Sequence, residues 1–142
     1  MATEVEFHTG VPDVPAFACR LLRKAYRRGA QLLVTADEPD LSTLDRLLWT
    51  QDALDFLPHV RWPAPEPLAT RSPIWLSACL PQAAQASGRV FINLGLAVPP
   101  APAGLARIIE VVGQAPDQVR AGRARWREYQ ALGLGIVHHA VS

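Results

Sequence analysis

The sequence lacks a dominant charge and a long apolar run. Its 142 residues carry 14 Lys and Arg against 13 Asp and Glu, so the formal net charge is +1. This balance excludes the long-range field of a dedicated duplex-DNA binder. The longest apolar runs, such as residues 90–98, are well short of the ~20 residues that a membrane span needs, and the first residues show no basic segment followed by an apolar one. We therefore expect a cytoplasmic protein with no membrane contact.

Cysteine is also scarce. Cys19 and Cys79 are far apart in the sequence, and neither has a partner at metal-ligand spacing. We expect both to be small buried apolar groups in a reducing compartment, without a disulfide framework or a structural zinc.

Signature motifs of catalysis are missing. The nine glycines form neither G-x-G-x-x-G nor a phosphate-binding G-x-x-x-x-G-K-[ST] loop, and no serine stands in a G-x-S-x-G elbow. The four histidines, His8, His59, His138 and His139, stand in no H-x-x-x-H or H-E-x-x-H spacing. We therefore predict no catalytic residue, no cofactor and no metal site.

What the sequence does contain is an alternation of strand-like and helix-like apolar patterns. Strands are predicted at residues 3–8, 31–35, 74–77, 89–94 and 107–112, with a final strand or extended tail at 133–138. Helices are predicted at residues 15–28, after the acidic, proline-bearing start at 37–40, and at 117–132. A chain of this length forms one domain, residues 1–142. The alternation predicts an α/β fold, a twisted, mostly parallel sheet with helices on both faces.

Five prolines between Pro58 and Pro73 interrupt this alternation. Proline has no backbone N–H and a fixed φ, so it disfavours a regular helix and removes donors from a central strand. We predict a proline-rich extended loop over residues 58–73, with at most an edge strand.

Two segments favour recognition of another protein. In the first, Trp49 and Phe56 stand at the end of a leucine-striped helix and in the turn after it. Two interpretations remain open for this pair. Large aromatic side chains dominate protein cores, and they are also typical anchors of protein interfaces.

In the second segment, four arginines and a tryptophan fall within eight residues that contain no acid: Arg120, Arg123, Arg125, Trp126 and Arg127. Helical spacing places Arg120, Arg123 and Arg127 on one side, with Trp126 next to Arg123. A solvated helix face and a binding patch both fit this pattern. Direct binding of single-stranded nucleic acid, by stacking and backbone neutralisation, is a further alternative.

The same two segments resemble a known family. Residues 44–59 (LDRLLWTQDALDFLPH) and 123–133 (RARWREYQALG) contain the patterns L-D-x-x-L-W, F-x-P-H and R-x-R-[YW]-[KR]-x-Y-x-x-x-G. These are the distinctive stretches of the chi subunit of the bacterial DNA polymerase III holoenzyme. The resemblance extends across nearly the whole chain, and it implies a single Rossmann-like domain without the nucleotide-binding fingerprint.

The resemblance also implies a function without catalysis. Chi joins the clamp loader through its small partner psi, and it binds the acidic, Phe-terminated tail of the single-stranded DNA-binding protein, so it reaches DNA only indirectly. By the resemblance, the tail site contains Arg123, Trp126 and Arg127, with Arg120 as an approximate substitute for a basic contact that falls near Val119. The runner-up hypothesis is a nucleotide-binding or nucleotide-processing α/β protein with a pocket at the carboxyl ends of the strands.

A second surface follows from the same resemblance. Trp49 and Phe56 match the psi-facing aromatics of the family in type and in separation. A helicase is a further candidate partner for the surface around Trp49.

Overall fold

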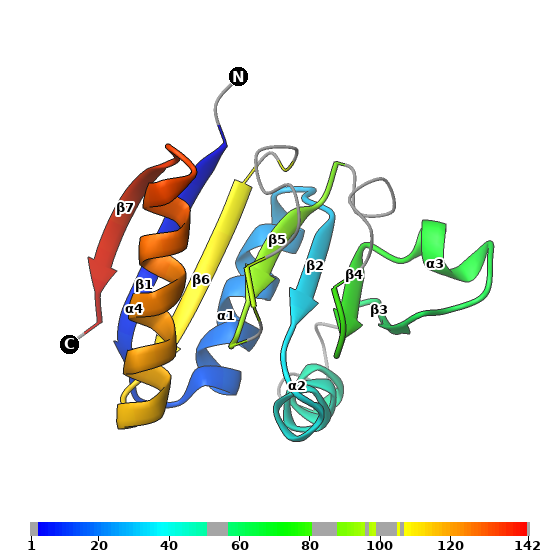
Figure 1. The fold of residues 1–142 in the computed structure, drawn as a ribbon. Helices are drawn as coiled ribbons and strands as arrows, with labels where there is room; N and C mark the ends of the chain where they lie inside the picture. Colours follow the sequence, from blue (N-terminus) through cyan, green and yellow to red (C-terminus); the bar gives the residue numbers. More distant parts are fainter. Residues whose placement is uncertain are drawn as a thin grey trace.

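The core of the molecule is one sheet with helices packed against it (Figure 1). The computed structural model describes residues 3–50, 57–80, 88–95, 97–98, 105 and 107–141. In this part of the chain the sheet has seven strands in the order β3-β4-β2-β5-β6-β1-β7, and every neighbouring pair is parallel. The strands are β1 Glu4–Val11, β2 Leu32–Thr35, β3 His59–Trp62, β4 Ile74–Ser77, β5 Val90–Asn93, β6 Arg107–Gly113 and β7 Gly135–Ala140. The predicted α/β class and parallel sheet are confirmed.

The helices lie on both faces of the sheet, as predicted. They are α1 Val14–Arg27, α2 Glu38–Thr50, the one-turn α3 Leu68–Arg71 and α4 Pro116–Ala131. One face packs against α1 and α2, where Leu22 and Leu44 meet Val34 of β2. The other face packs against α4, where Tyr129 meets Phe7 of β1. No helix in the described ranges is long and apolar enough to cross a membrane.

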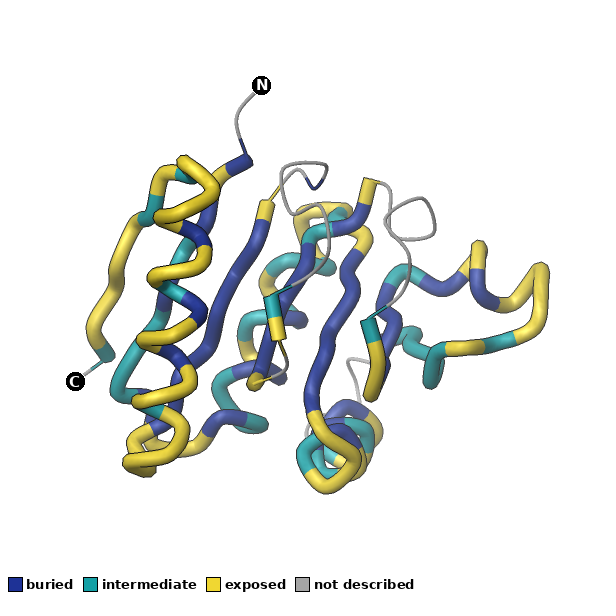
Figure 2. The backbone as a smooth tube through the Cα atoms, in the orientation of Figure 1, coloured by how far each residue is buried: buried dark blue, intermediate teal, exposed yellow. Residues whose placement is uncertain are grey.

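The central strands are buried on both faces (Figure 2). All four residues of β2 are buried, because Leu32 and Val34 face α1 and α2 while Leu33 faces the opposite layer. This explains the continuous apolar run in the sequence, which is typical of a parallel strand covered on both sides.

The start of α1 follows ordinary capping chemistry. Asp13 is the N-cap, and its Oδ1 accepts a hydrogen bond from the Ala16 N–H at 3.1 Å. Pro15 occupies the first turn, where its missing N–H removes no helical hydrogen bond. The helix therefore begins at the point that its sequence specifies.

The proline-rich segment differs from its prediction in one respect. The predicted edge strand is present as β3, but residues 68–71 form the single turn α3, although we expected no helix there. This turn contains no proline, and Pro67 precedes it at a position where proline is tolerated. Trp75 of β4 ties the turn to the sheet, because its Nε1–H donates to the Ala69 carbonyl at 2.7 Å.

The two cysteines have different environments. Cys19 on α1 is buried, as predicted, whereas Cys79 is exposed, so the prediction for Cys79 is wrong. Cys79 lies two residues beyond the end of β4, in a turn where the Ser77 hydroxyl donates to its carbonyl at 2.6 Å. The apolar run of β4 has ended by this point, so nothing in the strand pattern requires the thiol to be covered.

Candidate functional site

The helix α4 lies unusually close to the sheet at Gly122. A Cβ built on Gly122 would meet both methyl groups of Val112 in β6 at 2.9 Å, which is closer than real Cβ atoms approach a neighbour. Glycine is therefore the residue that permits this approach. The close contact fixes the height of α4 above β6 and β1.

A buried polar network holds α4 in place. Glu110 of β6 is fully buried, and its carboxylate accepts hydrogen bonds from Arg125 Nε at 2.8 Å, from the Tyr129 hydroxyl at 2.6 Å and from Asn93 Nδ2 at 3.0 Å. Burial raises the pKa of the Glu110 carboxyl, and the Arg125 cation opposes that shift. Burial and the nearby carboxylate also raise the pKa of the Tyr129 hydroxyl, which keeps it a donor. The contacts bind one side of α4 to the sheet at two consecutive turns.

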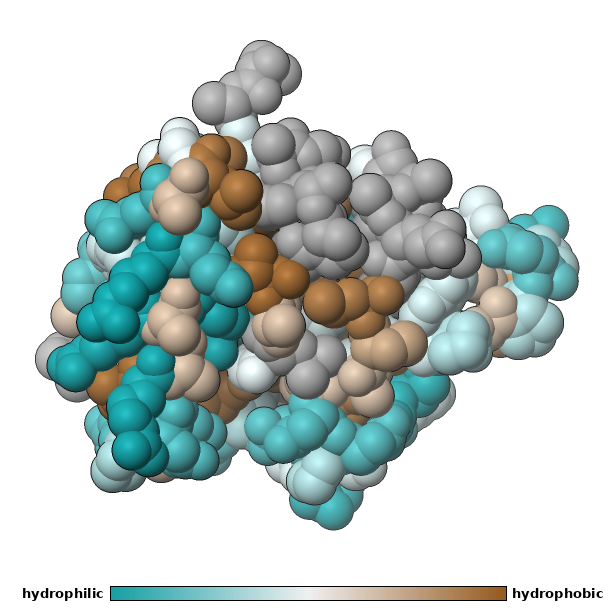
Figure 3. Space-filling view, viewed as in Figure 1, coloured by the Kyte–Doolittle hydropathy of each residue, from teal (hydrophilic) through white to brown (hydrophobic). Residues whose placement is uncertain are grey.

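The opposite edge of α4 borders a groove. The groove encloses about 630 Å³ between α4, β1 and β7, and Figure 3 shows that the exposed surface of α4 is largely hydrophilic. It is lined by Phe7, Thr9, Gly10, Val112, Val119, Gly122, Arg123, Trp126, Arg127, Gln130 and His138. The set combines two exposed cations with aromatic and apolar surface.

Aromatic rings form the wall of the groove. The Trp126 ring centroid lies 4.8 Å from that of Phe7 and 5.5 Å from that of His138, which it meets edge to face. His138 Nε2 lies 2.7 Å from Thr9 Oγ1, so the β7 histidine is held against β1. Trp126 is half-buried in this cluster and lines the groove.

Three of the residues expected at the tail site line this one groove: Arg123, Trp126 and Arg127. Arg120 is exposed on the same helix but is not among the lining residues. Arg125 was grouped with these cations in the sequence, yet it is buried against Glu110. Phe7, Thr9 and His138 also line the groove, although no sequence pattern predicts them there, because their strands meet α4 only in the folded chain.

The second predicted surface is described in part. Trp49, at the end of α2, is 56% exposed, so the core interpretation of this ring is wrong. Its ring lies 5.2 Å from that of His59, whose Nε2 is 2.6 Å from Asp45 Oδ1. Phe56 lies outside the described residues.

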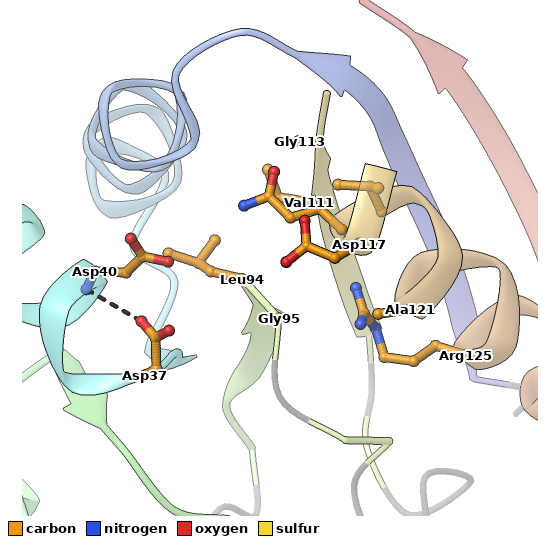
Figure 4. A pocket seen from close by; sticks show the side chains of 11 residues that line it. Asp37, Asp40, Leu94, Gly95, Val111, Gly113, Asp117, Ala121 and Arg125 are labelled. Atoms are coloured by element: carbon orange, nitrogen blue, oxygen red, sulfur yellow. Dashed lines mark hydrogen bonds between the residues drawn. The ribbon is translucent and has the colours of Figure 1, made fainter. Parts of the chain in front are cut away.

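A separate crevice lies at the carboxyl ends of the strands (Figure 4), where an open α/β sheet commonly binds nucleotides. It encloses about 200 Å³, and its lining includes Asp37, which directly precedes α2, Asp40 of α2 and Asp117 of α4. Burial and the neighbouring Asp37 raise the pKa of the Asp40 carboxyl. These carboxylates oppose the approach of a phosphate. The described part of the chain has no group of three His, Cys, Asp or Glu side chains placed to hold a metal ion.

Comparison with known proteins identifies the family of the chain. The model of the family described as "DNA polymerase III chi subunit, HolC" matches residues 2–137. A curated relative, DNA polymerase III subunit chi of Pseudomonas aeruginosa, is 33% identical over 123 residues, which cover 86% of this chain and 82% of the relative. With a family match over nearly its whole length, the chain belongs to the DNA polymerase III chi subunit family.

Proposed function

We propose that this accessory subunit of DNA polymerase III links the clamp loader, through psi, to the acidic C-terminal tail of the single-stranded DNA-binding protein. The observation that carries the proposal is the convergence of Arg123, Trp126 and Arg127 on one groove. The subunit binds and has no chemistry of its own.

The groove suits an acidic peptide that ends in phenylalanine. The guanidinium groups of Arg123 and Arg127 present paired N–H donors that match the two oxygens of a carboxylate, and such charge-assisted bonds are stronger than neutral ones. Trp126 and Phe7 provide apolar surface for the terminal ring. Burying a Phe side chain contributes about 1.5–3 kcal/mol, and this apolar part does not depend on ion screening.

The surface around Trp49 suits psi. An exposed tryptophan at a helix end is a typical anchor of an interface. Trp49 packs beside the His59 ring, and a contact with Asp45 holds that ring in place. A helicase is the alternative partner for the same surface.

The carboxylates of the crevice argue against the alternative function in nucleotide binding. Asp37, Asp40 and Asp117 line the crevice at the carboxyl ends of the strands, where an open α/β sheet commonly binds its ligand, and their negative charges would repel phosphates. Addition of mononucleotides is expected to leave the melting temperature unchanged.

The test of the tail site is titration of a labelled tail peptide at low and high salt. Arg123→Ala and Arg127→Ala should each weaken binding by a factor between about 10 and about 150, since a hydrogen bond to a charged group contributes about 1.5–3 kcal/mol. Trp126→Ala, or removal of the last Phe of the peptide, should weaken binding at both salt concentrations. Arg46→Ala, an exposed arginine on α2, is the matched control. Unchanged binding in all the α4 variants would place the tail elsewhere.

Trp49→Ala tests the second surface. Retention of psi on the immobilised subunit should be lost while the melting temperature changes little. Loss of a core aromatic would instead cost about 3–5 kcal/mol of folding stability. A stable variant that retains psi would refute the assignment of Trp49.

A further inference from the structure

The helix α1 carries a concentration of positive charge that the tail groove does not use. Residues 14–28 contain five of the fourteen Lys and Arg residues of the chain and no Asp or Glu, namely Arg20, Arg23, Lys24, Arg27 and Arg28. Nine cations against thirteen acids remain elsewhere. The balanced total charge therefore conceals one strongly basic element in an otherwise acidic molecule.

The basic residues are ordered along one side of the helix. Arg20, Lys24 and Arg28, here called the α1 stripe, follow one another at intervals of four residues, and all three are exposed. Eight residues at 1.5 Å per residue place the ends of this stripe about 12 Å apart. The opposite side of the helix, with Ala18 and Leu22, is buried against the sheet, so the stripe faces away from the molecule.

Local structural roles account for part of this charge only. Cations in the last turn of a helix interact favourably with its dipole, and this explains Lys24 and Arg27. Arg20 lies in the middle of the helix, beyond the reach of this effect. Within the described ranges, no carboxylate forms an ion pair with Arg20, Lys24 or Arg28.

The surroundings of the stripe select the class of ligand. Neither of the two cavities described above contains a residue of α1, so neither of them serves the stripe. Binding must come from several charges in a line. Phe17 lies beside the stripe as a half-buried ring, with the Arg20 guanidinium carbon 6.0 Å from its centroid. A line of cations beside an aromatic ring is a recurrent arrangement for single-stranded nucleic acid.

We infer that the α1 stripe is a second binding site, which takes the phosphate backbone of single-stranded DNA. A replication subunit works where such DNA is exposed, and arginine and lysine are the side chains that bind phosphate. The site lies on the face of the sheet opposite the α4 groove, so DNA and the acidic tail do not compete. It adds a direct DNA contact to the indirect one through the single-stranded DNA-binding protein.

The expected signature is a steep dependence on salt. For single strands, the logarithm of the association constant falls linearly with log[salt], with a slope of about −0.7 for each phosphate neutralised. Three contacts therefore predict a slope of about −2. Fluorescence anisotropy of a labelled oligodeoxythymidylate, titrated with the full chain at several salt concentrations, measures this slope.

The test variant is Arg20→Gln with Lys24→Gln. Glutamine is a good helix former, so α1 should persist, and an unchanged melting temperature checks this. Two lost contacts should flatten the slope by about 1.4 and weaken binding at low salt about tenfold. The control is Arg46→Gln with Arg71→Gln, which removes the same charge from two exposed arginines outside α1. This control should bind like the wild type.

Other outcomes would overturn the inference. Equal losses in both double variants would mean that only net charge matters. Displacement of the oligonucleotide by the tail peptide would place the DNA in the α4 groove. Tighter binding of an oligoglutamate peptide than of the oligonucleotide, lost in the test variant, would mean that the stripe serves an acidic protein. The oligonucleotide titrations and the tail-peptide titration are separate measurements. A negative result for one site therefore does not contradict the other.

Discussion

Two basic helices cover opposite faces of one sheet, and they use their cations differently. On α4, Arg123 and Arg127 border a groove that has an aromatic wall. On α1, Arg20, Lys24 and Arg28 form an exposed line that borders neither the α4 groove nor the crevice at the strand ends. The two helices have similar numbers of arginines, so composition does not set this difference. The difference comes from the side chains of the sheet against which each helix packs.

The packing beneath each helix explains the contrast. α1 packs against the sheet through its own aliphatic side chains, such as Leu22, whereas α4 is held by the buried carboxylate of Glu110 and by the close approach at Gly122. The groove lies at the edge of α4, between this helix and the strands β1 and β7. Charges beside an apolar wall select a shape as well as a charge, while charges in open solvent attract any polyanion and are screened by salt.

The largest expected effect comes from removing the anchor of α4. Glu110→Ala leaves the buried Arg125 without its partner, and breaking a buried ion pair in this way costs about 3–5 kcal/mol. The free energy of unfolding in urea should fall by that amount. Glu110→Gln, which keeps a hydrogen-bond acceptor, is the milder comparison. A Glu110→Ala protein as stable as the wild type would show that the network does not hold α4.

A smaller effect is expected at the close contact. Gly122→Ala places a methyl group against Val112, and overpacking of this kind costs about 1–3 kcal/mol. The substitution should also lift α4 and weaken tail binding, without changing oligonucleotide binding at the α1 stripe. On a free helix face, Gly→Ala would stabilise by about 0.5–1 kcal/mol, so an increase in stability would contradict the close approach.

The smallest effect concerns the rate of thiol labelling. Cys79 is exposed, whereas Cys19 lies on the buried side of α1, and burial raises the pKa of the Cys19 thiol. Because the thiolate is the reactive form, a maleimide should modify Cys79 quickly and Cys19 only when α1 leaves the sheet. Mass spectrometry of the wild type and of Cys79→Ser measures the two rates. Fast labelling of Cys79→Ser would mean that α1 is loosely packed.

Much of the fold could be predicted from local patterns. The alternation of Val5 and Phe7 in β1 and the apolar run of β2 depend on neighbours in the sequence, and both strands are present. The single turn α3 in the proline-rich segment could not be predicted in this way, because a contact between the Trp75 indole and the Ala69 carbonyl holds it against the sheet. Such a contact has no signature in a single sequence.

Some residues of the groove could be predicted from the sequence, and others could not. Helical spacing put Arg123 and Arg127 on one side of α4, and the structure places both on the groove. Arg125 stands among these cations in the sequence but is buried. One sequence signal indicates this: Glu110 is a carboxylate inside an otherwise apolar strand, and a buried carboxylate needs a cation as its partner. The wall residue His138 could not be found, because only the pairing of β7 with β1 brings it to α4.

The pairing of β7 with β1 also orders events during synthesis of the protein. Thr9 and His138 are 129 positions apart, and both stand at the groove. As the chain leaves the ribosome from its amino end, β1 and α1 emerge long before β7. A nascent chain can therefore display the cations of α1 while the groove still lacks its β7 wall. Under the proposed function, a molecule can bind the tail only after its seventh strand has joined the sheet, so tail binding would report that folding has reached this strand.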